Sequence, residues 1–236
     1  MGVGFAVPIN QARGIMDQLI KDGKVQRGYL GVGIQDVTGP LAKQFEVPEG
    51  KGALIAEVLE KSAAATAGLK PGDVIVEVNG KDVADSRQLK LLVSQIAPGT
   101  DVKLKYLRDG KEKTTQVNLK EKPDTDSDNV ESDSGDSSED ALDGVAVSDI
   151  TDASRSQLRL PETLKGALVM EVDASSAAFE AGLRQGDVIM EINKKPIKSA
   201  DDAVKATKNL KEKHLLLRVF TRGASHFIVV DETKKK

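Results

Sequence analysis

The sequence contains one segment twice, and this internal repeat limits the possible folds more than any other feature. The first copy reads Gly52-Ala-Leu-Ile-Ala-Glu-Val58, then Ala67-Gly-Leu69 and Gly72-Asp-Val-Ile75. The second copy begins at Gly166, 114 positions later, and keeps the same spacing. A fixed offset held over such a length indicates one supersecondary unit that is used twice. The chain is therefore expected to form two copies of one small domain.

The pattern within each copy predicts a mainly β fold with short helices, in the α+β class. A short Ala-rich helix is expected after Ser62 and after Ser176, whose side chains can cap it, and a longer amphipathic helix over 86–96 and over 200–210. Strands are expected at 53–59, 74–78, 102–107 and 114–119, and at 167–172, 188–192, 215–220 and 226–230. About five or six strands and two helices per copy would make a capped β-barrel or sandwich.

The composition excludes several functional classes. The 236 residues include no cysteine, which excludes disulfides, thiol catalysis and cysteine-based metal sites. The net charge of −3 gives no reason to expect nucleic-acid binding. No apolar stretch approaches the roughly 18 residues of a membrane-spanning helix, and the first residues lack a signal-peptide pattern. We expect no membrane span, no cofactor and no metal.

An acidic segment, residues 123–140, separates the two copies. It contains eight acidic residues, five serines, no basic residue and one apolar side chain. Such a segment cannot bury enough apolar surface to offset its ordering entropy, so a disordered linker is expected. A weak cation site at Asp124, Asp126 and Asp128 is the alternative, but the glycine and glutamate of an EF-hand loop do not fall at the required positions.

The residues before the first copy suggest a strand and a helix. Residues 2–8 contain glycines, but they lack the third glycine and the preceding strand of a dinucleotide-binding loop. Asn10 can cap a helix that runs to Asp22 and ends at Gly23.

Both copies contain the pattern Ala-Gly-Leu-x-x-Gly-Asp-x-Ile-x-x-x-Asn, which ends at Asn79 and at Asn193. This pattern resembles that of PDZ domains in their bacterial, circularly permuted form. The resemblance implies two PDZ-like capped β-barrel or sandwich domains in tandem.

The segment Arg27-Gly28-Tyr29-Leu30-Gly31-Val32 resembles the carboxylate-binding loop of PDZ domains. A peptide C-terminus is an anion, and successive backbone N–H groups that face one concavity bind an anion. Gly31 allows the backbone to turn inward without a Cβ atom in the way. Arg27 would add positive charge nearby.

A peptide is expected to add as a strand to the open edge of residues 32–37, beside the helix 86–96. The apolar pocket for its last side chain would be lined by Leu30, Val32, Ile34, Leu89, Val93 and Ile96. This pocket should prefer a terminal Val, Leu, Ile or Phe. The alternative for Leu89, Val93 and Ile96 is an ordinary core position, which is also the expectation for Leu92.

The corresponding loop of the second copy is Leu142-Asp143-Gly144-Val145-Ala146-Val147-Ser148. In this alignment Val147 replaces the inward-turning glycine and Asp143 replaces the basic residue. A branched residue resists that backbone geometry, and a carboxylate repels the terminus of the ligand. The second site is expected to be weak or silent.

Taken in order, these segments resemble the C-terminal part of the HtrA/DegP family of periplasmic serine proteases. The resemblance assigns 1–23 to the last protease strand and a connecting helix, 24–122 to the first PDZ domain, 123–140 to the linker and 141–233 to the second PDZ domain. The Gly-Asn-Ser-Gly-Gly motif of the protease does not occur. The histidines, His214 and His226, are expected to face solvent in strands rather than to serve a Ser-His-Asp triad. The chain is thus expected to be a fragment or a protease-less relative, and not an enzyme.

The resemblance implies a role in protein quality control in the periplasm. The first PDZ domain would capture peptide C-termini or extended segments of unfolded proteins for the protease. The second PDZ domain would contact the first PDZ domain of a neighbouring subunit, which predicts a homo-oligomer. The alternative is a purely structural assembly module without affinity for peptides.

Overall fold

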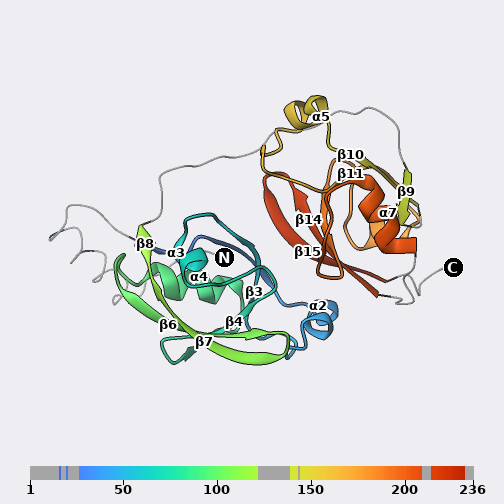
Figure 1. Cartoon of the computed structure of the whole chain (residues 1–236). Helices are drawn as coiled ribbons and strands as arrows, with labels where there is room; N and C mark the ends of the chain where they lie inside the picture. Colours follow the sequence, from blue (N-terminus) through green and yellow to red (C-terminus); the bar gives the residue numbers. More distant parts are fainter. Residues whose placement is uncertain are drawn as a thin grey trace, which may run out of the picture.

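The computed structural model describes residues 27–121, 139–142, 144–208 and 214–231, together with Met16 and Ile20. Met16 and Ile20 are helical and exposed. The rest of the helix expected over 10–22, the strand expected at 2–8 and linker residues 123–138 lie outside the described residues. The described residues form two β domains, one for each copy of the repeat (Figure 1).

The first domain is an open sheet with the strand order β2-β3-β4-β6-β7. Its strands are β2 (Val32–Asp36), β3 (Ala53–Val58), β4 (Val74–Val78), β6 (Asp101–Arg108) and β7 (Lys111–Asn118), with β5 (Lys81–Asp82) on β4. A separate pair joins β1 (Gly28–Tyr29) to β8 (Lys120–Glu121). The helices are α2 (Gly39–Gln44), α3 (Ala63–Thr66) and α4 (Ser86–Ser94).

The second domain repeats this plan with one strand added at the edge, in the order β15-β14-β12-β11-β10-β9. Its strands are β9 (Glu139–Leu142), β10 (Val145–Asp149), β11 (Ala167–Val172), β12 (Val188–Ile192), β14 (His214–Thr221) and β15 (Ala224–Asp231), with β13 (Lys195–Pro196) on β12. The helices are α5 (Asp152–Gln157), α6 (Ala177–Glu180) and α7 (Ala200–Lys208).

The mainly β class with short helices is confirmed, but three details differ from expectation. Both sheets are open, so neither described domain is a closed barrel. Each domain contains an additional helix, α2 or α5, which is too short for a helical period to stand out in the sequence. Glu139 and Asp140, expected in the linker, belong to β9.

The predicted serine caps are present in both domains. The Oγ of Ser62 accepts a hydrogen bond from the N–H of Ala65, and the Oγ of Ser176 accepts one from Phe179, each at 3.1 Å. Each domain also has its own aliphatic core, which includes Ile55 and Ile75 in the first and Ile189 in the second.

A third apolar cluster joins the two domains. Strand β15 lies against the outer face of β2 and β3, next to α2 (Figure 1). Leu216 and Phe227 of the second domain pack there with Val37, Phe45 and Leu54 of the first. The rings of Phe45 and Phe227 meet edge to face, with centroids 5.2 Å apart. The two domains therefore share a hydrophobic contact within one chain.

A buried aspartate occupies the same position in both domains but has different partners. Asp73 pairs with the guanidinium of Arg108 at 2.6 Å. Its counterpart Asp187 accepts a hydrogen bond from Thr221 at 2.6 Å, and burial raises the pKa of Asp187 above its ordinary value. His226 lies near it, and burial lowers the pKa of this histidine although Asp187 opposes the shift. The expectation that His226 faces solvent is wrong, because its position on β15 is half-buried.

Candidate peptide-binding site

The loop before β2 is attached to the body of the first domain through its carbonyl groups. The carbonyl of Leu30 accepts from the N–H of Ala64, and the carbonyl of Gly31 accepts from the N–H of Leu59, each at 2.9 Å. Gly31 has φ 75°, and a Cβ atom there would lie 2.3 Å from the Cβ of Ser62. Both the backbone angle and the space around it therefore require glycine.

Two successive N–H groups in the middle of this loop have no acceptor in the described part of the chain. Those of Leu30 and Gly31 donate to no acceptor among the residues that the structure describes. Free N–H groups on successive residues are the arrangement that binds a carboxylate or another anion. The loop can therefore bind a peptide C-terminus without breaking a hydrogen bond of the described domain.

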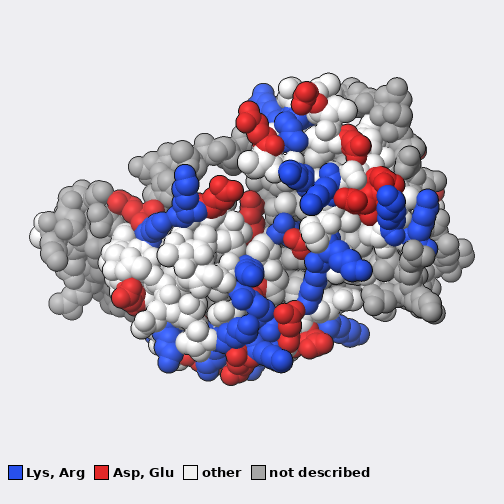
Figure 2. All heavy atoms as spheres, in the orientation of Figure 1, with Lys and Arg blue, Asp and Glu red and all other residues white. Residues whose placement is uncertain are grey.

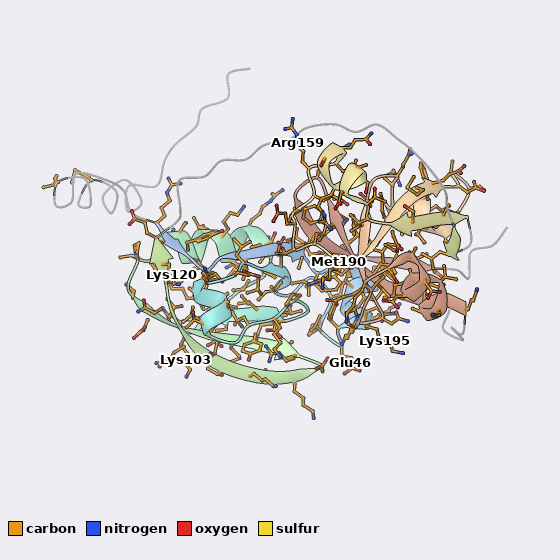
Figure 3. The ribbon with its side chains drawn as sticks, turned by 45° about the horizontal axis from the view of Figure 1, so that its top comes forward. Glu46, Lys103, Lys120, Arg159, Met190 and Lys195 are labelled. Atoms are coloured by element: carbon orange, nitrogen blue, oxygen red, sulfur yellow. The ribbon has the colours of Figure 1, made fainter. Side chains whose placement is uncertain are left out.

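The start of the loop is attached to the end of α4. The N–H of Gly28 donates to the carbonyl of Ile96 at 3.0 Å, and a Cβ at Gly28 would lie 2.5 Å from that oxygen. Tyr29 is half-buried and pairs with Lys120 of β8, which Figure 3 labels. Arg27 is exposed just before β1. Gly28 thus sets the position of the loop, whereas Gly31 shapes it.

Strand β2 is an edge strand, and α4 flanks it. At the far end from the loop, the carboxylate of Asp36 accepts a hydrogen bond from the N–H of Ser86 at 2.9 Å. Hydrogen bonds from the side chain and the N–H of Ser86 hold the pKa of Asp36 below its ordinary value. Strand β2 is thus linked to the start of α4 through Asp36, and the loop before β2 is linked to the residues after α4 through Gly28.

The apolar residues expected in the pocket fall into two groups. Leu30, Leu89 and Val93 are buried in the core, with relative exposures of 4%, 1% and 6%. Val32, Ile34 and Ile96 are half-buried at the edge of the same cluster, and Leu92 joins them. Four apolar side chains are therefore partly accessible at this edge: Val32 and Ile34 on β2, Leu92 on α4 and Ile96 just after α4. Leu92 was expected in the core, but its place in the helical period beside Ile96 also allows an edge position.

The second domain contains the same loop, three residues before the position expected for it. Gly144 has φ 71°, and its carbonyl accepts from the N–H of Asp173 at 2.7 Å, as Gly31 does from Leu59. Gly144 is therefore the counterpart of Gly31, and the assignment of that role to Val147 is wrong. Val147 lies fully buried in β10, where it corresponds to Ile34. Gly31 and Gly144 are 113 positions apart, close to the offset of 114 in the repeated core, whereas the expected alignment paired Gly31 with a residue 116 positions away. Asp143 lies outside the described residues.

Other kinds of site find little support in the described part of the chain. It contains no group of three or more His, Asp or Glu side chains suited to a metal ion. None of its helices is long and apolar enough to cross a membrane. Lys and Arg side chains are mixed with Asp and Glu over both domains on the face shown in Figure 2. A cavity of about 700 Å³ opens between α2 and the second domain, away from the loop at Gly31.

Comparison with known proteins supports two domains of one family. The family model for the PDZ domain matches residues 28–119 and 141–223. A probable periplasmic serine endoprotease, DegP-like, from Pseudomonas putida is 39% identical over 232 residues, which cover 97% of this chain and 48% of the relative. A probable periplasmic serine endoprotease, DegP-like, from Halomonas elongata is 35% identical over 236 residues, which cover 100% of this chain and 48% of the relative.

The chain spans about half the length of the curated relatives that it matches. Among solved structures, the HtrA-type protease AlgW with a decapeptide aligns with a TM-score of 0.46 and 32% identity, covering 52% of this chain and 38% of that one. The family model covers most of the chain, and the loop geometry occurs in both domains. The chain therefore belongs to the PDZ domain family, with two copies of the domain in tandem.

Proposed function

We propose that the first domain binds extended peptides that end in a free carboxylate after an apolar residue. The peptide adds as a strand to the open edge of β2. Its terminal carboxylate meets the N–H groups of Leu30 and Gly31, and its last side chain lies near Val32, Leu92 and Ile96. The observation that carries this proposal is the loop at Gly31, whose carbonyls are bound inward while its N–H groups are free among the described residues.

In the full-length protein, this region would serve an HtrA/DegP-type serine endopeptidase of the periplasm. The similarity to DegP-like periplasmic endoproteases over almost the whole chain supports this assignment. The first PDZ domain would hold the C-termini or extended segments of unfolded proteins near the protease. PDZ contacts between subunits would support a homo-oligomer. Within this chain the two domains meet through Phe45 and Phe227, and the same contact made between two chains would support such assembly.

The test is a peptide titration of the whole chain. A fluorescent peptide ending in Leu or Val with a free carboxylate should bind, and the same peptide with an amidated end should bind more weakly by about 1–3 kcal/mol, because a charge-assisted set of hydrogen bonds is lost. Equal affinity for both peptides would refute recognition of the C-terminus. No measurable affinity for any peptide of this class would favour the purely structural assembly module.

A further inference from the structure

The residues just before the glycine loop pair differently in the two domains. In the first domain, β1 pairs with β8, and no strand of the described residues pairs with the outer edge of β2. In the second domain, β9 folds back and pairs with the outer edge of β10. The paired residues are Val145 with Leu142, Ala146 with Asp140 and Val147 with Glu139, in antiparallel register.

Strand β9 occupies the place that corresponds to the proposed peptide site of the first domain. Strand β10 is the counterpart of β2, and α7 is the counterpart of α4. The carboxylate of Asp149 accepts from the N–H of Ala200 at 2.7 Å, just as that of Asp36 accepts from Ser86. Strand β9 lies along β10 and also contacts α7 (Figure 1). The space between strand and helix that is open in the first domain is thus filled in the second.

The direction of β9 matches that of a bound peptide. A peptide whose C-terminus reaches the glycine loop must run antiparallel to the strand that follows the loop. Strand β9 runs in this direction, and its last residue, Leu142, is next to the loop at Gly144. The Leu142 side chain is 6% exposed and packs in the core cluster with Val145 and Val204. Leu142 thus occupies the position of the terminal apolar residue of a ligand.

We propose that the segment Glu139–Leu142 is an internal ligand, which fills a peptide-binding site of the second domain. This inference rests on the proposed function of the first domain, because it assigns the same chemistry to the second. When β9 leaves, the site takes an extended peptide with an apolar last residue. The segment 139–142 therefore competes with any external peptide. If the open form makes up less than about 10% of the molecules, the apparent affinity of the second site is at least about 10-fold weaker than its intrinsic affinity.

The experiment uses the whole chain and a probe that copies residues 137–142, Ser-Ser-Glu-Asp-Ala-Leu with a free carboxylate. Backbone NMR shifts report binding separately at Val32–Asp36 and at Val145–Asp149. Two variants open the second site: Leu142→Asp, and replacement of residues 139–142 by Gly-Ser-Gly-Ser. Both should bind the probe at β10 at least about 10-fold more tightly than the wild type does.

A locked variant is the matched control. Asp140 and Ala146 are directly opposed in the antiparallel pair, at a separation that a disulfide can bridge. The double variant Asp140→Cys and Ala146→Cys, when oxidised, should show no probe binding at β10, and reduction should restore the wild-type response. The chain has no other cysteine to interfere.

The two sites are judged independently. Shifts at Val145–Asp149 in an opened variant support the internal ligand, whatever happens at β2. An opened variant that folds but shows no shifts there overturns it. If both opened variants lose the folded second domain, β9 is a structural strand, and the inference is also overturned. Missing shifts at Val32–Asp36 in the wild type count against the proposed function of the first domain alone.

Discussion

The side-chain amide of Gln35 forms two hydrogen bonds with the backbone of Phe227. Its Nε2 donates to the carbonyl of Phe227 at 3.1 Å, and its Oε1 accepts from the N–H of Phe227 at 2.7 Å. Phe227 lies on β15, an edge strand whose outward N–H and carbonyl would otherwise lack a strand partner. Because Gln35 lies on β2, the strand proposed to bind peptide also holds the second domain.

Removal of this amide should loosen the contact between the domains. In Gln35→Ala, both backbone groups of Phe227 lose their partner, which should cost about 1–3 kcal/mol. Amide hydrogen exchange at Phe227 should therefore become faster by about 5- to 150-fold. Gln116→Ala, at an exposed position of β7, is the matched control and should leave this exchange unchanged. An unchanged rate in Gln35→Ala would show that the apolar contact alone holds the domains together.

Gly31→Ala should weaken peptide binding strongly. The added Cβ would displace the loop from Ser62 and turn its N–H groups away from the ligand. Loss of charge-assisted hydrogen bonds of about 1.5–3 kcal/mol corresponds to roughly 10- to 150-fold in affinity, measured by fluorescence anisotropy.

Gly80→Ala is the control for Gly31→Ala. Gly80 has a similar φ of 79°, but no atom lies within 4 Å of its added Cβ. This control should lose some stability through backbone strain and keep its affinity for peptide. If the two variants bind equally well, the close contact between Gly31 and Ser62 does not matter for binding.

Asp36→Ala should reduce peptide affinity by a few-fold without unfolding the domain. The variant frees the start of α4 from β2, so that strand and helix are no longer held at a fixed spacing. Asp36→Asn retains an acceptor for the N–H of Ser86 and should preserve most of the affinity. Asp149→Ala makes the same change in the second domain and should leave binding at β2 unaffected. An Asp36→Ala variant with full affinity would show that Gly28 and Ile96 position the helix sufficiently.

The second domain should lose stability as the pH falls below about 6.5, the ordinary pKa of histidine. Burial lowers the pKa of His226 in the folded state, so the unfolded chain takes up the proton first. The contribution of His226 to the free energy of unfolding is fully present above the pKa that this histidine has in the unfolded chain. It is lost as the pH falls toward the pKa in the folded state, by at most about 1.4 kcal/mol per pH unit.

The measurement compares urea unfolding of the wild type and of His226→Gln between pH 5 and 8. The variant should lack the part of the pH dependence that His226 causes. Asp187 acts in the opposite direction, because its pKa is raised in the folded state. Its contribution to the free energy of unfolding is lost as the pH rises above the ordinary pKa of aspartate. His214→Gln, at a position with 55% side-chain exposure, is the matched control. Identical pH profiles for the wild type and His226→Gln would contradict this assignment.

Local features of the chain were readable from the sequence because they depend on neighbouring residues. The repeat, the serine caps at Ser62 and Ser176 and the turn at Gly31 follow from backbone geometry within a few residues. The period of apolar residues located the strands and the longer helices for the same reason. The identity of the domains followed from the spacing of these local features.

Only the tertiary structure decided how these parts meet. The sequence alignment assigned the role of Gly31 to Val147, three residues beyond Gly144, because the register of this segment becomes visible only when the strands pair. The residues before the glycine loop pair with β8 in the first domain and with β10 in the second. The contact of Gln35 with Phe227 joins residues 192 positions apart, and no local pattern encodes such a distance. Packing between distant segments therefore determined which binding edge is open and which is filled.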